Sequence, residues 1–104
     1  MIDLLRIVGF DWDTGNARKS VEKHDVSQAE AEQVFFNQPL LVLPDPRHSE
    51  KESRHHALGN SDESRLLHIT FTLRVEETLV RVISARDMHR KERFIYEQKQ
   101  EDTP

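Results

Sequence analysis

The residues from Leu66 to Leu73 alternate between two kinds of side chain, and this alternation constrains the fold more than any other feature. Every second residue is large and apolar, which is typical of a β-strand with one face in a core. The apolar set is Leu67, Ile69, Phe71 and Leu73, and the other set is Leu66, His68, Thr70 and Thr72. Glu76-Glu77 predicts a turn before a second strand from Leu79 to Ile83, so the two strands form an antiparallel hairpin.

The rest of the chain contains two early helices and several short strands. Ser27 begins a capping box with Glu30, and the helix that follows it must end by Pro39. The other expected elements are a strand over Leu4 to Trp12 that bulges at Gly9, a helix over Thr14 to Lys23 capped by Asp13, and strands over Leu40 to Leu43 and Arg54 to Leu58.

A cationic segment spans residues 81–93. It holds five Lys and Arg side chains against two acidic ones, in a protein whose net charge is -4. Such a segment can attract a polyanion such as a nucleic-acid backbone. Ser84 and Asp87 have the spacing of another capping box, which predicts that the strand ends at Ile83 and that a terminal helix begins here.

These elements give the order β-α-α-β-β-β-β-α. Short loops between the last four strands favour an antiparallel sheet of four to five strands, packed by two N-terminal helices and a C-terminal helix, in an α+β fold. With 104 residues the chain is expected to form one domain over residues 1–104, with its core over about 10–97 and a tail that could be flexible. The chain has no cysteine, no secretory signal and no apolar run near the ~20 residues of a membrane span, so we expect a cytoplasmic protein.

An ordered set of short motifs resembles the BrnT family of toxins. The motifs are Phe10-Asp11-Trp12-Asp13, Lys23-His24, Val26-Ser27, Glu52-Ser53-Arg54, Ala57-Leu58-Gly59, Arg81-Val82-Ile83-Ser84-Ala85-Arg86, Glu92-Arg93 and Tyr96-Glu97. The resemblance implies a small ribonuclease with a RelE-like fold that inhibits translation and growth and needs no metal or cofactor. It also implies a BrnA-like antitoxin that neutralises the toxin and binds operator DNA, so that the toxin contacts DNA only indirectly. The resemblance implies no association with a membrane.

The chain departs from the family pattern at three positions. Asn16 stands where a lysine is frequent, and Ser20 where an asparagine is frequent. Asp25 stands where a glycine usually follows the Lys-His pair. A left-handed backbone at that position costs aspartate more than glycine, and aspartate adds negative charge beside Lys23 and His24. We therefore expect Asp25 to bear on the strength of the activity rather than on the fold.

RNA cleavage by its own 2′-hydroxyl needs a base, positive charge around the phosphate and a proton for the leaving oxygen. Arginine suits the second task, because its planar fork can hold two phosphate oxygens. The candidates for the phosphate clamp are Arg54, Arg81 and Arg86. Histidine is the side chain whose ordinary pKa lies closest to neutrality, so His24 is the candidate for proton transfer, with Lys23 adding charge and Glu52 as an alternative base.

Several of these residues also have plain structural explanations. Arg81 can extend along the sheet margin with its charge in solvent, and Lys23 and His24 suit the end of a helix dipole. Arg90, Lys91, Arg93 and Tyr96 are further candidates for RNA binding. Tyr96 and Trp12 could each stack on a base, but an aromatic residue in so small a chain is more often in the core.

Two other functions remain open. His48, His55, His56 and His68 are close in sequence and could hold a metal in a hydrolase, although adjacent strand residues such as His55 and His56 should face opposite ways. Alternatively, the cationic segment could bind an acidic protein or a nucleic acid without cutting it. Resistance to a chelator would separate the ribonuclease from the metal hydrolase, and RNA cleavage would separate it from the binding module.

Overall fold

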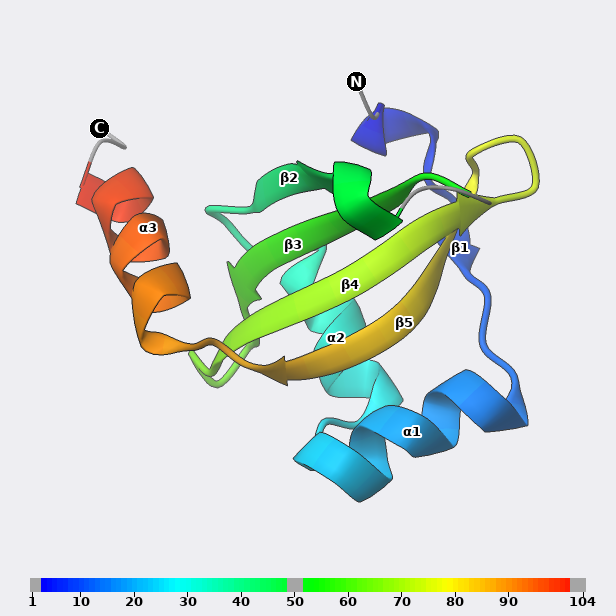
Figure 1. The fold of residues 1–104 in the computed structure, drawn as a ribbon, viewed down its shortest axis with the longest axis horizontal. Coiled ribbons are helices and arrows are strands. Elements are labelled where there is room, and N and C mark those ends of the chain that lie inside the picture. The colour runs from blue at the N-terminus through cyan, green and yellow to red at the C-terminus, as the bar shows by residue number, and fades with distance from the viewer. Residues whose placement is uncertain (1–2, 49–51, 102–104) are drawn as a thin grey trace.

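A five-stranded sheet forms the centre of the protein, with the strand order β1-β5-β4-β3-β2 (Figure 1). The computed structural model describes residues 3–48 and 52–101, without the side chains of residues 19–22, 48, 100 and 101. The strands are β1 (Gly9–Phe10), β2 (Leu41–Asp45), β3 (Arg54–Asn60), β4 (Leu66–Arg74) and β5 (Leu79–Asp87). The helices are α1 (Thr14–His24), α2 (Gln28–Val34) and α3 (Arg90–Glu101), with short 3-10 turns η1 (Leu4–Arg6) and η2 (Pro46–His48).

All strand pairs are antiparallel except β1 with β5, which is parallel. The α+β class, the element order and the number of strands are therefore as the sequence predicted. No helix among the described residues is long and apolar enough to cross a membrane.

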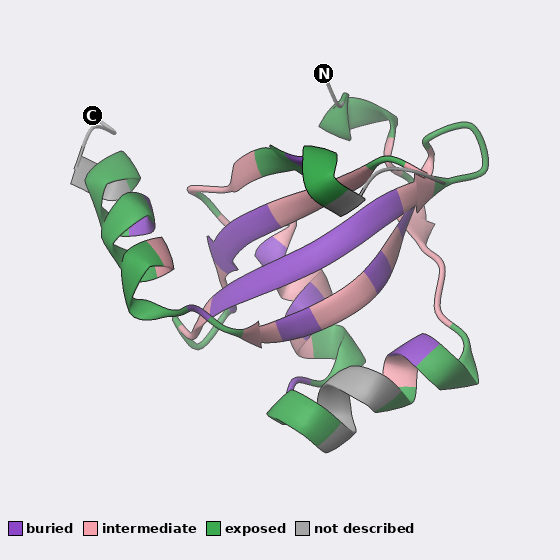
Figure 2. Cartoon of the chain, in the orientation of Figure 1, coloured by how far each residue is buried: buried purple, intermediate pink, exposed green. Residues whose placement is uncertain are grey.

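The core lies between α2 and one face of the sheet. β4 is the central strand, and its predicted apolar residues Leu67, Ile69 and Phe71 are fully buried there (Figure 2). α2 lies behind the sheet in Figure 1, where Ala31 and Val34 join the same cluster and the ring of Phe35 meets that of Phe71 edge to face at 5.1 Å. This packing covers one face of the sheet, and the other face remains available for polar side chains.

The two helix starts follow the predicted caps. Ser27 Oγ accepts the backbone N–H of Glu30 at 3.1 Å, and Asp13 Oδ1 accepts that of Asn16 at 3.0 Å. Asn16 also holds α1 against the sheet, because its Nδ2 donates to the Val82 carbonyl at 3.0 Å. α1 therefore lies beside β5, along the part of that strand that the short strand β1 does not cover (Figure 1).

Asp25 adopts the left-handed conformation that its position after α1 predicts, with a φ of 55°. Its carbonyl accepts a hydrogen bond from Arg65 Nη1 at 2.9 Å. This bond fixes the backbone in a conformation that aspartate tolerates better than most residues, although not as well as glycine.

The predicted N-terminal strand over Leu4 to Trp12 is mostly wrong. Leu4–Arg6 forms η1, capped by the Asp3 carboxylate, and only Gly9–Phe10 pairs with β5. β1 is an edge strand and gains hydrogen bonds on one side only. Further along β5, the side chain of Asn16 from α1 binds the Val82 carbonyl in place of a longer β1. The apolar residues in this segment reflect packing at the sheet edge rather than a long strand.

The predicted helix start at Ser84 is also wrong. β5 continues to Asp87, where it pairs with Leu67, because the long central strand β4 satisfies the backbone of residues 84–87 better than a new helix would. α3 begins at Arg90 instead. His89 precedes it, and its backbone N–H donates to Glu92 Oε1 at 2.8 Å, which is one half of a capping box. Arg86 is thus a strand residue.

Candidate active site

The second face of the sheet, which we call the polar face, carries three rows of side chains across β2, β3, β4 and β5. Cross-strand pairing defines each row, because directly paired residues of antiparallel strands point to the same side. The first row is Asp45, Arg54, Thr72 and Arg81; the second is Leu43, His56, Thr70 and Ser84; the third is Leu41, Leu58, His68 and Arg86. Two of the predicted phosphate ligands thus lie in the first row, and the third arginine lies in the third row.

Arg81 is held by acidic residues that precede α1. Its Nη2 lies 2.7 Å from Asp13 Oδ2, and its Nη1 lies 3.6 Å from Asp11 Oδ2. The hydrogen bond that Arg81 donates to Asp13 raises the pKa of Arg81, and the Asn16 N–H together with Arg81 lowers that of Asp13. Both groups are therefore charged at neutral pH. The Asp13 carboxylate is largely exposed, so an anionic ligand can compete with it for Arg81.

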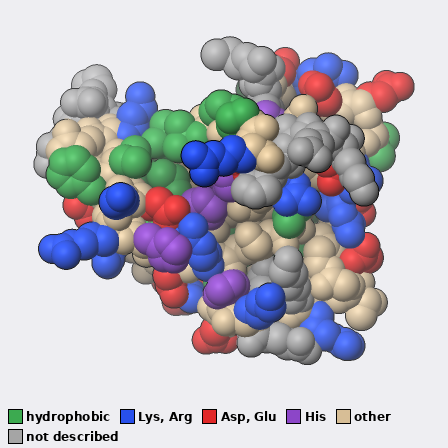
Figure 3. Space-filling view, viewed as in Figure 1, with side chains coloured by type: hydrophobic (Ala, Val, Ile, Leu, Met, Phe, Trp, Pro, Cys, Tyr) green, Lys and Arg blue, Asp and Glu red, His purple; other side chains and the backbone are tan. Residues whose placement is uncertain are grey.

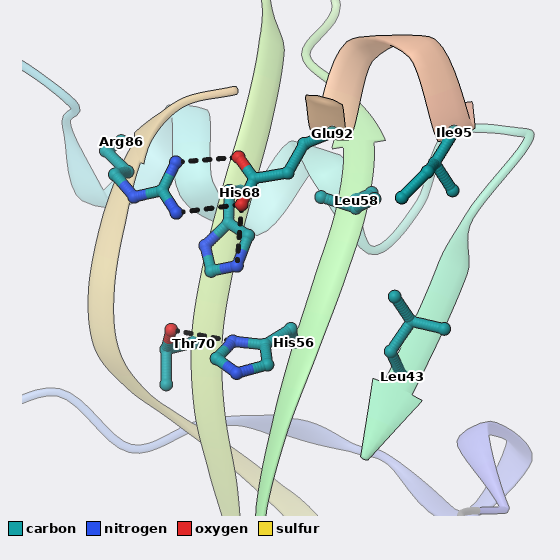
Figure 4. A pocket seen from close by; sticks show the side chains of 8 residues that line it. All are labelled: Leu43, His56, Leu58, His68, Thr70, Arg86, Glu92 and Ile95. Atoms are coloured by element: carbon teal, nitrogen blue, oxygen red, sulfur yellow. Dashed lines mark hydrogen bonds and ion pairs between the residues drawn. The ribbon is translucent and has the colours of Figure 1, made fainter. Parts of the chain in front are cut away.

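Arg86 is held more firmly, by a carboxylate from α3. Its two terminal nitrogens lie 2.8 and 2.9 Å from the two oxygens of Glu92 (Figure 4). Burial alone would raise the pKa of Glu92, but the hydrogen bonds from Arg86 and from the His89 N–H outweigh it and lower that pKa to about 2. The pair is bidentate and partly shielded from water, which makes it stronger than an ordinary surface ion pair.

His68 lies beneath this pair. Its Nε2 is 3.6 Å from Glu92 Oε2, and its buried Nδ1 makes no hydrogen bond. Burial, together with the nearby charge of Arg86, lowers the pKa of His68 to about 4. This imidazole is therefore neutral at neutral pH.

A hollow of about 400 Å³ opens on the polar face between β2 and α3. Figure 3 shows histidine, cationic and acidic side chains gathered here beside a hydrophobic area. The side chains that line the hollow are Leu43, His56, Leu58, His68, Thr70, Arg86, Glu92 and Ile95 (Figure 4). It is a mixed site, lined by three aliphatic side chains together with a guanidinium, a carboxylate, two imidazoles and a hydroxyl.

The sequence reasoning named His56 only as a possible metal ligand and missed its partners Asp45 and Thr70. Its Nε2 lies 2.9 Å from Asp45 Oδ2 and its Nδ1 lies 3.0 Å from Thr70 Oγ1. The alternation of β3 put His56 and His55 on opposite faces of the sheet. It could not show that Asp45 of β2 supplies a carboxylate to the His56 ring.

Lys23 and His24 lie apart from the arginine rows, exposed at the end of α1. The His24 carbonyl accepts a hydrogen bond from Arg65 Nη2 at 3.2 Å. The hydrogen bond from Arg65 lowers the pKa of the Asp87 carboxyl, and the nearby His24 ring adds to this effect. Arg65, which the sequence reasoning did not single out, also binds both Asp87 oxygens and Glu30. It fastens the α1–α2 junction to the ends of β4 and β5.

Glu52 lies at the opposite end of the polar face. Its Oε2 is 3.0 Å from Arg74 Nη2, and its charge contributes to the raised pKa of Arg81. It therefore belongs to the surroundings of the first row. Residues 49–51, which include Glu50, and the side chains of Ser20 and His48 lie outside the described residues.

Tyr96 is not available for stacking on a base, contrary to its prediction as an RNA-binding residue. It is fully buried with Leu58 and Met88, and its hydroxyl donates to the Pro39 carbonyl at 2.6 Å. Trp12 is likewise engaged in structure, because its Nε1 donates to Glu32 at 2.7 Å. Arg90, Lys91 and Arg93, by contrast, are exposed on α3.

The histidine side chains that the structure describes, which exclude that of His48, do not gather into one metal site. His55 faces the core side, where its ring lies 5.6 Å from that of Phe71, while His56 and His68 face the other way. This is the separation that their adjacency predicted. Within residues 3–48 and 52–101, no group of three or more His, Asp or Glu side chains is placed to hold a metal ion.

The lowered pKa of His68 predicts a pH dependence of stability. Between pH 6.5 and about 4 the unfolded imidazole takes up a proton that the folded one does not, so the free energy of unfolding should fall as the pH falls. His68→Gln should flatten this slope in urea denaturation measured across that window. His55, whose pKa burial also lowers, should leave a residual slope of the same sign. Equal slopes for parent and variant would contradict the assignment.

Comparison with known proteins identifies the family and a similar fold. Residues 12–92 match the family described as "Ribonuclease toxin, BrnT, of type II toxin-antitoxin system". The fold is similar to that of the Brucella abortus ribonuclease toxin BrnT, solved at 1.1 Å, with a TM-score of 0.60 and 20% sequence identity over 80% of this chain and 99% of that one. No curated protein matches the chain. The chain belongs to the BrnT family of ribonuclease toxins of type II toxin-antitoxin systems.

Proposed function

We propose that this BrnT-family protein is an endoribonuclease that cleaves cytoplasmic RNA and thereby inhibits translation and growth. The observation that carries the proposal is the placement of Arg54, Arg81 and Arg86 on one face of the sheet, the face that α2 does not cover. Three guanidinium groups on one face suit a polyanionic backbone.

The spacing of the rows suggests how an RNA strand lies. Arg54 and Arg81 both pair with Thr72, so they stand on either side of β4, roughly 10 Å apart at the backbone. Arg86 pairs with His68, four residues along the same strand, which is roughly 13 Å away. We therefore assign the first row to the phosphate that is cut and Arg86 to a neighbouring phosphate.

The carboxylates that now hold these arginines set the cost of binding. Water screens the ion pair of Arg81 with the exposed Asp13 carboxylate, so this pair contributes little and a phosphate can replace Asp13 easily. The bidentate, partly buried pair of Arg86 with Glu92 costs more to break. Arg81 is therefore the readier phosphate ligand, and Arg86 can share its donors only in part.

The remaining predicted site residues receive roles that follow from their positions. Arg90, Lys91 and Arg93 would attract RNA from exposed positions on α3. His24 would transfer a proton with Lys23 beside it, and Glu52 is the alternative base. Both alternatives require RNA to extend to an end of the sheet, because His24 neighbours Asp87 at the end of β5 and Glu52 neighbours Arg74 at the end of β4.

Removing either arginine tests the proposal. Arg81→Ala and Arg86→Ala should each lower the rate of RNA cleavage by roughly 30-fold to 1000-fold, because a phosphate contact that strengthens in the transition state is worth about 2–4 kcal/mol. The measurement is cleavage by purified variants at equal concentration, with folding checked by circular dichroism. Arg6→Ala is the matched control, because it removes an equal charge from a residue outside the three rows, which donates to the Glu76 carbonyl, and it should cut normally.

Parental rates for both arginine variants would make the cationic segment a docking surface and move the search to Lys23, His24 and Glu52. A folded parent protein that cuts no RNA would favour the non-catalytic binding module.

We further propose that cleavage needs no metal ion, because the arginines can supply the positive charge that a metal would otherwise bring to the phosphate. Activity should therefore persist in excess EDTA at the rate seen without it. A loss of cleavage on chelation that zinc or manganese restores would instead support the histidine-ligated hydrolase.

The partner proposed for this toxin is a cognate BrnA-like antitoxin, which would itself bind the operator DNA. The polar face and α3 favour a partner segment that is both acidic and apolar. Cationic side chains of α3 adjoin exposed Phe94 and Ile95, which are 65% and 45% exposed, and Leu43 on β2 is 37% exposed. An amphipathic segment could neutralise the arginines and cover these apolar residues at once.

Co-expression with the antitoxin should relieve growth inhibition and protect the cationic segment from hydrogen exchange. Because β5 is already paired with β4, and the amides of Met88, His89 and Arg93 already donate hydrogen bonds, the informative amides are those of residues 90–92 in the first turn of α3. Protection confined to the surface of α2, with residues 90–92 still exchanging freely, would contradict the blocking mechanism while leaving the enzyme proposal intact.

A further inference from the structure

Asp45, His56 and Thr70 form a continuous chain of hydrogen bonds across three strands. Asp45 Oδ2 lies 2.9 Å from His56 Nε2, and His56 Nδ1 lies 3.0 Å from Thr70 Oγ1. Asp45 and Thr70 are buried, whereas the His56 side chain is 26% exposed and lines the hollow (Figure 4). The chain therefore links a buried carboxylate to a site that solvent can enter.

The chemistry of the three groups fixes the direction of the hydrogen bonds. An ionised carboxylate can only accept, so Nε2 of His56 carries the hydrogen and Nδ1 is the acceptor. The Thr70 hydroxyl then donates to Nδ1 and keeps its lone pairs free for another donor. This is the order of roles in which a carboxylate orients an imidazole that acts as a base toward a hydroxyl group.

The position of this chain on the polar face suits proton transfer at a phosphate. His56 and Thr70 belong to the second row, between the row of Arg54 and Arg81 and the row of Arg86. Thr70 is two residues from Thr72, so it lies roughly 7 Å along β4 from the first row. Among the described residues, the other ionisable groups around His56 are Arg54 on β3, His68 on β4, Arg86 on β5 and Glu92 on α3.

Of these ionisable groups, His56 is the one placed to accept a proton in the hollow. His68, whose ring centre is 4.7 Å from that of His56, is buried beneath the Arg86–Glu92 pair, and its Nδ1 is out of contact with solvent. Glu92 is committed to Arg86, His89 and His68. Only the Thr70 end of the chain combines a basic nitrogen with a hydroxyl that an RNA in the hollow can reach.

We propose that His56 is the general base of the proposed ribonuclease, acting through the hydroxyl of Thr70, and that Asp45 is a positioning residue that holds its ring. The inference rests on the proposed ribonuclease activity. It replaces neither the arginine clamp nor the phosphate assignment, but it puts the base in the middle of the polar face rather than at His24 or Glu52.

The hydrogen-bonded residues Asp45, His56 and Thr70, together with water, provide every proton transfer that the reaction needs. The ribose 2′-hydroxyl gives its proton to Thr70 Oγ1, whose own proton passes to His56 Nδ1. The 2′-oxygen forms a bond to phosphorus, the bond from phosphorus to the 5′-oxygen breaks, and the leaving oxygen takes a proton from water. The products are a 2′,3′-cyclic phosphate and a free 5′-hydroxyl, and the imidazolium then returns its proton to solvent.

The test compares purified, folded variants in a cleavage assay across pH. His56→Gln should lower the rate by roughly 100-fold to 10,000-fold, the range that a positioned base contributes, and should abolish the fall in rate at low pH. Thr70→Val should lower the rate similarly, whereas Thr70→Ser, which keeps the hydroxyl, should restore it to within several-fold. His55→Gln alters the neighbouring histidine on the core side and is the matched control, with parental cleavage expected.

Asp45→Asn supplies a readout that a merely structural contact would not move. An amide cannot stabilise the charged imidazolium, so the fall in rate at low pH should shift to lower pH. The relay is overturned if His56→Gln and Thr70→Val cut RNA at the parental rate, or if His24→Ala alone removes the acidic limb. In both cases the parent still cuts RNA, so the proposed function stands; a parent protein that cuts no RNA overturns both.

Discussion

A single irregularity in β5 determines the character of the polar face. Arg81 and Arg86 are five residues apart, and on a regular strand an odd separation puts two side chains on opposite faces. The register between β4 and β5 shifts between Thr70 and Phe71, so that Val82 pairs with Phe71 and Ser84 pairs with Thr70. Ile83 is the additional residue. Because of this bulge both arginines reach the same face, while Val82 and Ala85 both stay in the core.

The same bulge explains why α3 matters to the site. Once Arg86 reaches the polar face, its charge needs a partner, and the first turn of α3 supplies Glu92. That carboxylate also caps α3 through the His89 N–H, so a single side chain sets the start of the helix and the orientation of the guanidinium. Tyr96 and Met88 then pack on Leu58 and anchor α3 at the end of the sheet. The hollow is a consequence of this anchoring, because Ile95 and Glu92 form its α3 side.

The sequence predicted what depends on local patterns and missed what depends on pairing. The alternation of β4, the caps at Asp13 and Ser27 and the opposite orientations of His55 and His56 are each encoded within a few residues, and the structure has them all. The extension of β5 to Asp87 depends on the length of β4, and the spacing of Ser84 and Asp87 indicated a helix that pairing overrides. The site shows the same division. Arg81 and Arg86 could be named from the cationic segment, but the link of His56 to Asp45 joins strands whose register no local pattern reveals.

The departures from the family pattern have structural consequences that differ in kind. Asn16 stands where the family resemblance predicts a lysine, and it holds three backbone groups together, an arrangement we call the clamp. Its amide nitrogen donates to the carbonyls of Asp11 and Val82, and its oxygen accepts the Asp13 N–H. The clamp fixes Asp13, which in turn holds Arg81. A lysine in that place would add charge near the first row but could not supply the acceptor that Asp13 uses. Asp25 acts further away, since its strained backbone is held by Arg65 rather than by any group of the polar face. The position that bears on the proposed phosphate binding is therefore Asn16, through the orientation of Arg81, whereas the cost at Asp25 falls on the stability of the α1–α2 junction.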